Sequence, residues 1–167
     1  MSTGDPGEVV RLPLRWRRTT DPVRGVLVSA RCPVAGASGV VPTIRLEMTA
    51  VTGSLHRWRE NDLLATAARR RDFELDDEDD YDLDGREVSY RRFGFRRGAD
   101  DLLCEQWAWL VEGLGYTLTC TVGRGDYLDY CDVFEAVAAT FDPQPVGSPR
   151  AARSARSATA CTSVRAS

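Results

Sequence analysis

The amino-acid sequence predicts an α+β fold in which an antiparallel β-sheet is flanked by helices. Three observations favour this class. Several short segments alternate apolar and polar residues, which is typical of half-buried strands. Two segments, within residues 54–71 and 126–141, instead place their apolar residues at helical spacing. Residues 102–122 contain two strand-like runs joined by Glu-Gly-Leu-Gly, which indicates a β-hairpin.

Length and composition are those of one ordinary domain. The chain has 167 residues, of which 43% are apolar, and it carries a net charge of −3. We expect a single domain over residues 1–142 and a flexible tail over residues 143–167, because the tail is rich in Pro, Ala, Ser and Arg and has few large apolar residues. The tail contains four Arg and no acid, so the remainder is the more acidic part, which disfavours nucleic acid as its partner.

The first residues and the hydropathy pattern bear on location. The opening stretch MSTGDPGEVVRLPLRW has no apolar run of signal-peptide length, and no later stretch approaches the roughly 18 apolar residues of a membrane span. We therefore expect a cytoplasmic protein with no membrane span. The sequence does not predict its oligomeric state.

The first half of the chain predicts a hairpin, a further strand and a helix. Residues 10–16 and 25–33 are expected to be strands joined by a turn at Thr20, Asp21 and Pro22. Residues 42–51 alternate apolar and polar side chains, as a third strand would. Ser54 is the expected N-cap of a helix over residues 55–71. Its apolar face would comprise Leu55, Trp58, Leu64, Ala65 and Ala68.

The second half predicts a register and a covered face. With Gly113 as the first central residue of a type II′ turn, Trp109 would lie opposite Leu118 and Trp107 opposite Cys120. The two Trp would then share one face of the sheet with the aliphatic residues. The final helix is expected to pack on this face through an apolar stripe comprising Tyr130, Phe134, Val137, Ala138 and Phe141.

The opposite face of the sheet is the candidate partner-binding face. A tight connection that pairs Arg97 with Leu102 would place Phe93 and Phe95 beside small polar residues, as an apolar patch with a polar rim. The candidate residues are Phe93, Phe95, Gln106, Ala108 and Thr119. In the alternative, a second helix over residues 54–70 covers the two Phe, which then belong to the core.

One stretch resembles a calcium loop. Asp80, Asp82 and Asp84 alternate and precede Gly85, as in an EF-hand. The twelfth position, however, is Arg91 rather than a bidentate Glu, and the residues that follow Gly85 read as a strand rather than a helix. We interpret the stretch as a solvated acidic strand and turn, and we predict no metal site.

Residues suited to catalysis are sparse. The five Cys are scattered without a Cys-x-x-Cys pair, and His56 is the one histidine. No cluster of acid, base and nucleophile is evident, so we predict no catalytic residues, no cofactor and no enzymatic activity.

Three stretches, taken in order, resemble a known family. They are VPTIRLEMTAVTGSLHRW, EQWAWLVEGLGYTLTCTV and FEAVAATF, and the resemblance extends from about Val9 to Phe141. The chain resembles the small α/β sandwich family of the PsbP and DcrB proteins, which is related to the Eag-type secretion chaperones. The resemblance implies binding without chemistry, as in photosystem accessory subunits, lipoproteins, nuclear-transport cofactors and chaperones of secreted effectors. The chain lacks the lipobox Cys of the lipoproteins and the Lys-rich character of the plant subunits.

The functional expectation is therefore a non-catalytic intracellular adaptor or chaperone. Its partner would be a polypeptide, for example a secreted effector with an apolar segment. Two alternatives stay open. A small-molecule or lipid carrier would have an enclosed cavity well above about 300 Å³. An enzyme of unknown class would have a buried site with a strongly shifted carboxylate pKa.

Overall fold

The computed structural model describes residues 8–143, and Val10–Phe141 form the compact unit discussed below. Its strands are β1 (Arg17–Asp21), β2 (Val26–Arg31), β3 (Thr43–Ala50), β4 (Arg71–Leu83), β5 (Arg86–Arg97), β6 (Asp100–Val111) and β7 (Leu114–Gly123). Its helices are α1 (Leu55–Arg69) and α2 (Tyr127–Ala139), with short 3-10 turns at Pro22–Arg24 and Arg124–Asp126. The predicted antiparallel sheet with two helices is confirmed.

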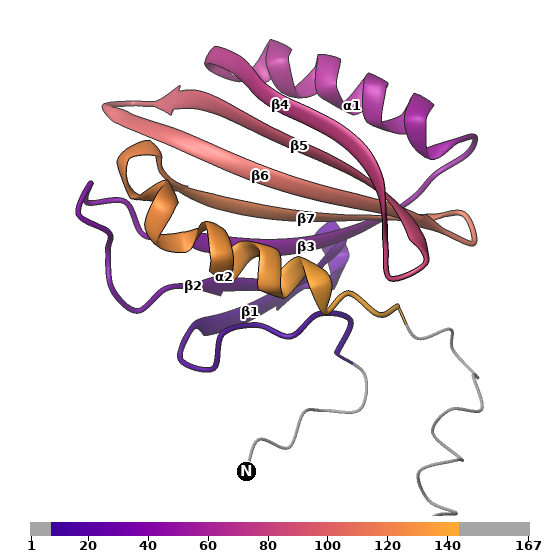
Figure 1. Cartoon of the computed structure of the whole chain (residues 1–167), viewed down its shortest axis with the longest axis horizontal. Coiled ribbons are helices and arrows are strands. Elements are labelled where there is room, and N and C mark those ends of the chain that lie inside the picture. The colour runs from indigo at the N-terminus through magenta and orange to yellow at the C-terminus, as the bar shows by residue number, and fades with distance from the viewer. Residues whose placement is uncertain (1–7, 144–167) are drawn as a thin grey trace, which may run out of the picture. The chain divides into compact units, whose positions relative to one another are not determined.

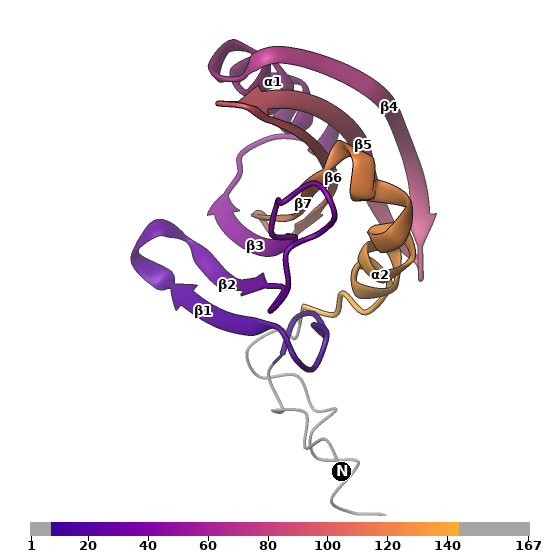
Figure 2. The same ribbon diagram turned by 90° about the vertical axis from the view of Figure 1, so that its left-hand side faces the viewer.

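All seven strands form one antiparallel sheet in the order β1-β2-β3-β7-β6-β5-β4. Figure 1 shows the sheet with α2 in front of it and α1 beside β4. Strands β4 to β7 form a continuous meander, and β3 pairs with β7 to join the first hairpin to it. Figure 2 shows the same sheet from the side, where its strands follow a curved surface. This curvature accords with the twist of antiparallel sheets.

Helix α2 covers one face of the sheet, as the apolar stripe predicts. Phe134, Val137 and Ala138 are buried. Just beyond the helix, the ring of Phe141 stacks on Trp109 with a centroid distance of 3.9 Å and an interplanar angle of 11°. The Trp face is therefore a core, as expected.

Helix α1 lies on the opposite face and contacts β4, β5 and β6. Ser54 is its N-cap and accepts a hydrogen bond from the backbone N–H of Arg57 over 3.2 Å, which confirms the predicted start. Trp58 approaches β7 at Gly115, where a Cβ would lie 2.6 Å from the Trp58 ring. A glycine at this position is therefore needed for the close contact.

Two expectations for the first half of the chain are wrong. Residues 10–16 form no strand, and β1 begins at Arg17. Pro13 has no N–H for a ladder, and its carbonyl instead accepts a hydrogen bond from Trp16 N in a turn. The apolar face expected for α1 also differs, since Leu64 is 71% exposed while Arg59 and Thr66 are buried with Leu55. The helix packs on a polar part of the sheet, so it presents polar side chains to it.

The hairpin registers differ from prediction by two residues. Trp109 lies opposite Tyr116 and Trp107 opposite Leu118, because the turn is formed by Glu112 and Gly113, both with positive φ. The β5–β6 pairing shifts likewise, so that Phe93 lies opposite Cys104. Side chains alternate with a period of two along a strand, so a shift of two leaves every predicted face unchanged.

The long loop between β2 and β3 is held against the end of β7. Asp126 is buried and accepts hydrogen bonds from the backbone N–H of Ser38, at 3.2 Å, and from its hydroxyl. These bonds fix residues 39–41 beside the α1 face of the sheet. Asp126, the last residue of the Arg-Gly-Asp sequence at residues 124–126, thus has a structural role.

The remaining predictions on chain organisation concern the ends. The tail expected over residues 143–167 lies outside the described residues, apart from Pro143. Within residues 8–143, no helix combines the length and apolar character needed to cross a membrane.

Candidate functional site

A cleft of about 750 Å³ lies on the α1 face of the sheet. The main contacts of helix α1 are with β4, β5 and β6, and Trp58 near its start packs on Gly115 of β7, so the cleft lies over the rest of β7 and over β3 and β2. The second half of α1 forms one wall, and the loop at residues 39–41 contributes another. The cleft is therefore the space that α1 leaves open on its own face of the sheet.

The floor of this cleft is polar. Alternate residues of β3 and β7 point to the α1 face, and most of them carry hydroxyl groups. The hydroxyl-bearing residues of the floor are Ser29, Thr43, Thr117, Thr119 and Thr121. Threonine suits a strand because it is β-branched, and its hydroxyl both donates and accepts hydrogen bonds. The floor can thus bind a polar ligand at several points.

Four of the five predicted partner-binding residues line this cleft, but their chemistry differs from the expectation. Phe93, Phe95, Gln106 and Thr119 line the cleft, whereas Ala108 is fully buried. The two Phe are only 2% and 4% exposed, so they do not form an exposed apolar patch.

Three groups cover the two Phe rings. Phe73 at the start of β4 packs on Phe93 with a centroid distance of 5.3 Å. The guanidinium of Arg70, just after α1, lies 4.4 Å from the centroid of Phe95. Val40 from the β2–β3 loop completes the same cluster. The two Phe are therefore core residues, as in the alternative, although the groups that cover them come from β4, the β2–β3 loop and the residue after α1 rather than from the body of the helix.

A buried network of two arginines lies beneath the α1 wall of the cleft. Gln106 Oε1 accepts hydrogen bonds from Arg59 Nη2 at 2.9 Å and from Arg91 Nε at 2.8 Å. Gln106 Nε2 donates to the hydroxyl of Thr119 at 3.0 Å, which joins the network to the floor. Asp62 forms ion pairs with both arginines. Two buried guanidiniums thus share one adjacent carboxylate.

Burial lowers the pKa of Arg59 to about 10 and also lowers the pKa of Arg91. In both cases the main cause is desolvation, which disfavours the charged form. Both side chains still carry their charge at neutral pH. They therefore contribute positive potential behind the cleft wall, offset in part by Asp62.

Sequence reasoning missed this network. The sequence pattern singled out Arg91 only as the residue at the twelfth position of the apparent calcium loop, and it did not single out Arg59. A signal was available, because alternation along β5 places Arg91 on the same face as Phe93. The spacing of Arg59, Asp62 and Thr66 also matches one side of a helix.

The rim of the cleft carries an excess of positive charge. Five arginines line it, against three carboxylates, namely Glu47, Asp62 and Asp100. Glu47 pairs with Arg45 at 2.9 Å, and Asp62 pairs with the buried arginines. The other rim arginines are Arg31, Arg69, Arg70 and Arg97. None of these four forms an ion pair with a carboxylate within residues 8–143.

The thiol of Cys104 and the imidazole of His56 lie at different places in this unit. Cys104 lines the cleft, and burial raises its pKa to about 11, so it is a protonated thiol at neutral pH. His56 belongs to the N-terminal part of α1, where its Nε2 lies 3.2 Å from Glu60 and its Nδ1 3.9 Å from Asp80. The cleft therefore offers binding groups rather than an activated nucleophile.

The stretch that resembles a calcium loop forms a strand end and a tight turn. Asp80 and Asp82 belong to β4, while Asp84 and Gly85 adopt positive φ in the turn to β5. The carboxylate of Asp82 accepts the backbone N–H of Gly85 at 2.8 Å. These residues are thus part of a hairpin, as predicted, and not of a helix–loop–helix. No set of three or more candidate metal ligands converges within residues 8–143.

Comparison with known proteins identifies the fold. No protein-family model matches the chain, and no curated protein matches its sequence. A protein of unknown function from Pseudomonas aeruginosa, PA94, has a similar structure, with a TM-score of 0.63 and 15% identity over 80% of this chain and 90% of that one. LpqN of Mycobacterium tuberculosis, involved in cell envelope biogenesis, has a TM-score of 0.60 and 16% identity, covering 85% of each chain.

The cyanobacterial PsbP (CyanoP) of Synechocystis sp. PCC 6803 has a TM-score of 0.50 and 14% identity, covering 86% of this chain and 98% of that one. The protein therefore has a PsbP-like fold, as the resemblance of its sequence predicts. At these identities the similarity concerns the fold alone, so function must be argued from the cleft.

Proposed function

We propose that the protein is a non-catalytic adaptor or chaperone that binds an acidic segment of a partner polypeptide in the cleft on the α1 face. The observation that carries this proposal is the set of four rim arginines that have no carboxylate partner within residues 8–143, placed around a floor of hydroxyl groups. Such a surface is electrostatically complementary to a chain of carboxylates. Threonine hydroxyls would donate hydrogen bonds to the polar groups of the same segment or accept hydrogen bonds from them.

The extent of the cleft supports an extended ligand. Its lining residues come from β2, β3, β7, β6 and β5, which are neighbours in the sheet. Five adjacent strands span four spacings, or about 19 Å, which is the length of about six residues of extended chain. The cleft is open to solvent along this path, so a segment could enter from the side without the threading of a chain end.

The chemistry of the cleft changes the expected partner. An apolar segment would need exposed apolar rings, whereas Phe93 and Phe95 are covered. The proposed partner segment is therefore acidic and polar. We also propose that the protein is related to the DcrB proteins and to the Eag-type chaperones. Its partner would then be a secreted effector.

A carrier of a small anionic molecule is the second candidate. The volume of about 750 Å³ exceeds the 300 Å³ that the carrier alternative requires and falls within the range of small-molecule sites. The cleft is not enclosed, however, and its hydroxyl floor and arginine rim do not suit a lipid tail. A small molecule with carboxylate or phosphate groups would use the same arginines.

The test is a quantitative pull-down from cells that produce the protein. The baits are the wild type and the variant Arg31→Ala/Arg69→Ala/Arg97→Ala. We expect the wild type to retain a polypeptide that the variant loses, and higher salt to weaken the retention. Overlapping synthetic peptides of the retained polypeptide should then locate binding in a Glu- or Asp-rich segment.

A second triple variant, Arg15→Ala/Arg17→Ala/Arg57→Ala, removes the same charge from exposed positions outside the cleft. This control should retain the polypeptide as the wild type does. Equal loss by both variants, or binding that maps to an uncharged segment, would refute the adaptor proposal. Native mass spectrometry of the purified protein tests the carrier candidate. A small anion that remains bound to the wild type, and not to the variant Arg31→Ala/Arg69→Ala/Arg97→Ala, would support a carrier.

A further inference from the structure

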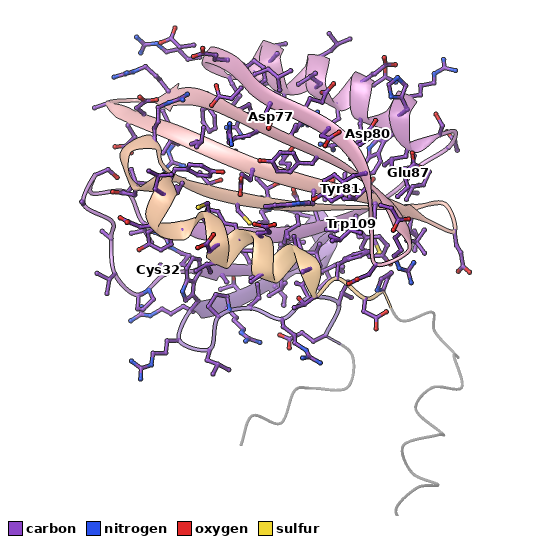
Figure 3. The ribbon with its side chains drawn as sticks, in the orientation of Figure 1. Cys32, Asp77, Asp80, Tyr81, Glu87 and Trp109 are labelled. Carbon is purple, nitrogen blue, oxygen red and sulfur yellow. The ribbon has the colours of Figure 1, made fainter. Side chains whose placement is uncertain are left out.

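A second pocket, of about 420 Å³, lies on the opposite face of the sheet, between β4, β5, β6 and α2. Four aromatic side chains line it: Tyr81 from β4, Tyr90 from β5, Trp107 from β6 and Tyr127 from α2. Figure 3 shows Tyr81 on β4 together with Asp77 of the same strand. The pocket does not share the walls of the arginine-lined cleft.

The aromatic walls are held in place by mutual contacts. Trp107 Nε1 donates a hydrogen bond to the hydroxyl of Tyr81 at 3.0 Å. The rings of Tyr90 and Trp107 lie 5.3 Å apart, centroid to centroid. A preformed group of aromatic rings is the kind of wall that attracts a cation through the negative faces of the rings.

The other lining residues give the pocket a negative charge. They include carboxylates from three elements, namely Asp77, Glu78, Asp79, Glu105 and Glu135, and no Arg or His of residues 8–143 is among them. Arg92 lies beside the pocket: its Nη1 donates to the hydroxyl of Tyr127 at 3.2 Å, and its guanidinium lies 5.3 Å from the centroid of the Tyr127 ring. The guanidinium of Arg92 also lies 3.9 Å from Asp76, and Arg92 is not part of the lining. The pocket thus combines aromatic rings with five carboxylates, whose charge Arg92 offsets in part.

Glu105 gives an independent indication that the pocket suits a hydrogen-bond donor. The residue is 5% exposed and lines the pocket. Its Oε1 accepts hydrogen bonds from the hydroxyl of Tyr90, at 2.9 Å, and from that of Tyr127. Its Oε2 is buried and has no hydrogen-bond partner within the described residues. A buried carboxylate oxygen without a donor is costly, so a ligand that brings an N–H group would complete the site.

We propose that this pocket binds an organic cation that carries N–H donors, namely a primary ammonium or a guanidinium group. The aromatic rings and the rim carboxylates attract the charge, and Glu105 accepts the N–H. A quaternary ammonium has no N–H, so it satisfies the rings but not Glu105. The cation belongs either to a free amine or to a Lys or Arg side chain of a polypeptide, and the two sources share this chemistry.

Isothermal titration calorimetry of the full chain tests the proposal. The probes are agmatine, the blocked peptide Gly-Arg-Gly and tetramethylammonium chloride. We expect saturable one-to-one binding of agmatine or of the peptide and weaker binding of tetramethylammonium. Tighter binding of agmatine would identify a free amine as the ligand, and tighter binding of the peptide would identify a side chain of a polypeptide.

Matched variants make the test specific. Asp79→Asn/Glu135→Gln removes one rim charge from β4 and one from α2, and it should weaken binding about tenfold. Asp80→Asn/Asp132→Asn makes the same charge change on the same two elements outside the pocket, and it should bind as the wild type does. The proposal fails if neither N–H probe binds at millimolar concentration, if both variants bind alike, or if tetramethylammonium binds as tightly as the other probes.

Discussion

Arg91 on β5 and Gln106 on β6 lie directly opposite each other, and the Nε atom of Arg91 donates to Gln106 Oε1 over 2.8 Å inside the protein. Arg91 is only 2% exposed, which is unusual for an arginine. The amide of Gln106 also accepts a bond from Arg59, so two guanidiniums depend on this amide and on the carboxylate of Asp62.

Removal of the charge of Asp62 should therefore destabilise the fold. Asp62→Asn removes the ion-pair partner of two buried guanidiniums, a change that costs about 3–5 kcal/mol when the pair is fully buried. The side chain of Asp62 is 35% exposed, so we expect a smaller loss, of about 1–3 kcal/mol. Urea unfolding measures the change. The control Glu60→Gln, on the same helix but at the surface, should cost no more than about 1 kcal/mol, and equal effects of both variants would contradict this account.

Substitution of Phe93 distinguishes a core residue from a surface patch. Because Phe93 packs between Phe73, Phe95 and the neighbouring strand, Phe93→Ala should lower the free energy of unfolding by about 3–5 kcal/mol. Leu128→Ala is a suitable control, since Leu128 is 83% exposed and its loss should cost no more than about 0.5 kcal/mol. Chemical unfolding of both variants gives the comparison, and a Phe93 variant of wild-type stability would place the ring at the surface.

The faces of the sheet could be predicted from the sequence because alternation survives an error of two residues in register. Trp107 and Trp109 lie under the final helix, and Phe93 and Gln106 share the other face, although both hairpin turns differ from the predicted ones. The turn at Glu112 escaped prediction because a non-glycine residue at φ 50° has no clear sequence signal.

The character of the candidate site could not be predicted in the same way. Phe93 and Phe95 are covered in part by Val40, which is distant from them in the chain, and by Arg70, which lies just beyond the end of α1. The cleft exists because α1 packs over β4 to β6, and helical periodicity does not determine where a helix sits on a sheet. The predicted apolar face of α1 included Leu64, which is exposed in the structure. That face therefore predicted a different packing of the helix on the sheet.

The cysteines should differ sharply in reactivity. Burial raises the pKa of Cys104 to about 11 and that of Cys120 well above its usual value, so neither forms thiolate in the native protein at pH 8. Among the four cysteines of residues 8–143, Cys32 and Cys131 are half-buried and should react first. Alkylation with iodoacetamide at pH 8, followed by peptide mass mapping, gives the order. Modification of Cys104 or Cys120 in the folded protein as fast as Cys131 would contradict the buried positions.

Glu105 should make the fold less stable as the pH rises. Its pKa is raised from the ordinary value of 4.5, mainly by desolvation, and hydrogen bonds from Tyr127 and Tyr90 oppose that shift. Between pH 4.5 and the raised pKa, the native state binds more protons at this carboxyl than the unfolded state does. The contribution of Glu105 to the free energy of unfolding is therefore fully present below pH 4.5 and is lost as the pH rises through that window.

Two variants should move this pH dependence in opposite directions. Glu105→Gln has no carboxyl to titrate, so the contribution of this residue to the slope should disappear. Tyr90→Phe removes a hydrogen bond that favours the carboxylate, so the pKa of Glu105 should rise further and the loss of stability with pH should be larger. Urea unfolding at a series of pH values from 4 to 8 measures both slopes relative to the wild type. If all three proteins gave the same slope, Glu105 would not be the titrating group. Its carboxyl would then not have the buried, tyrosine-bonded environment described for the second pocket.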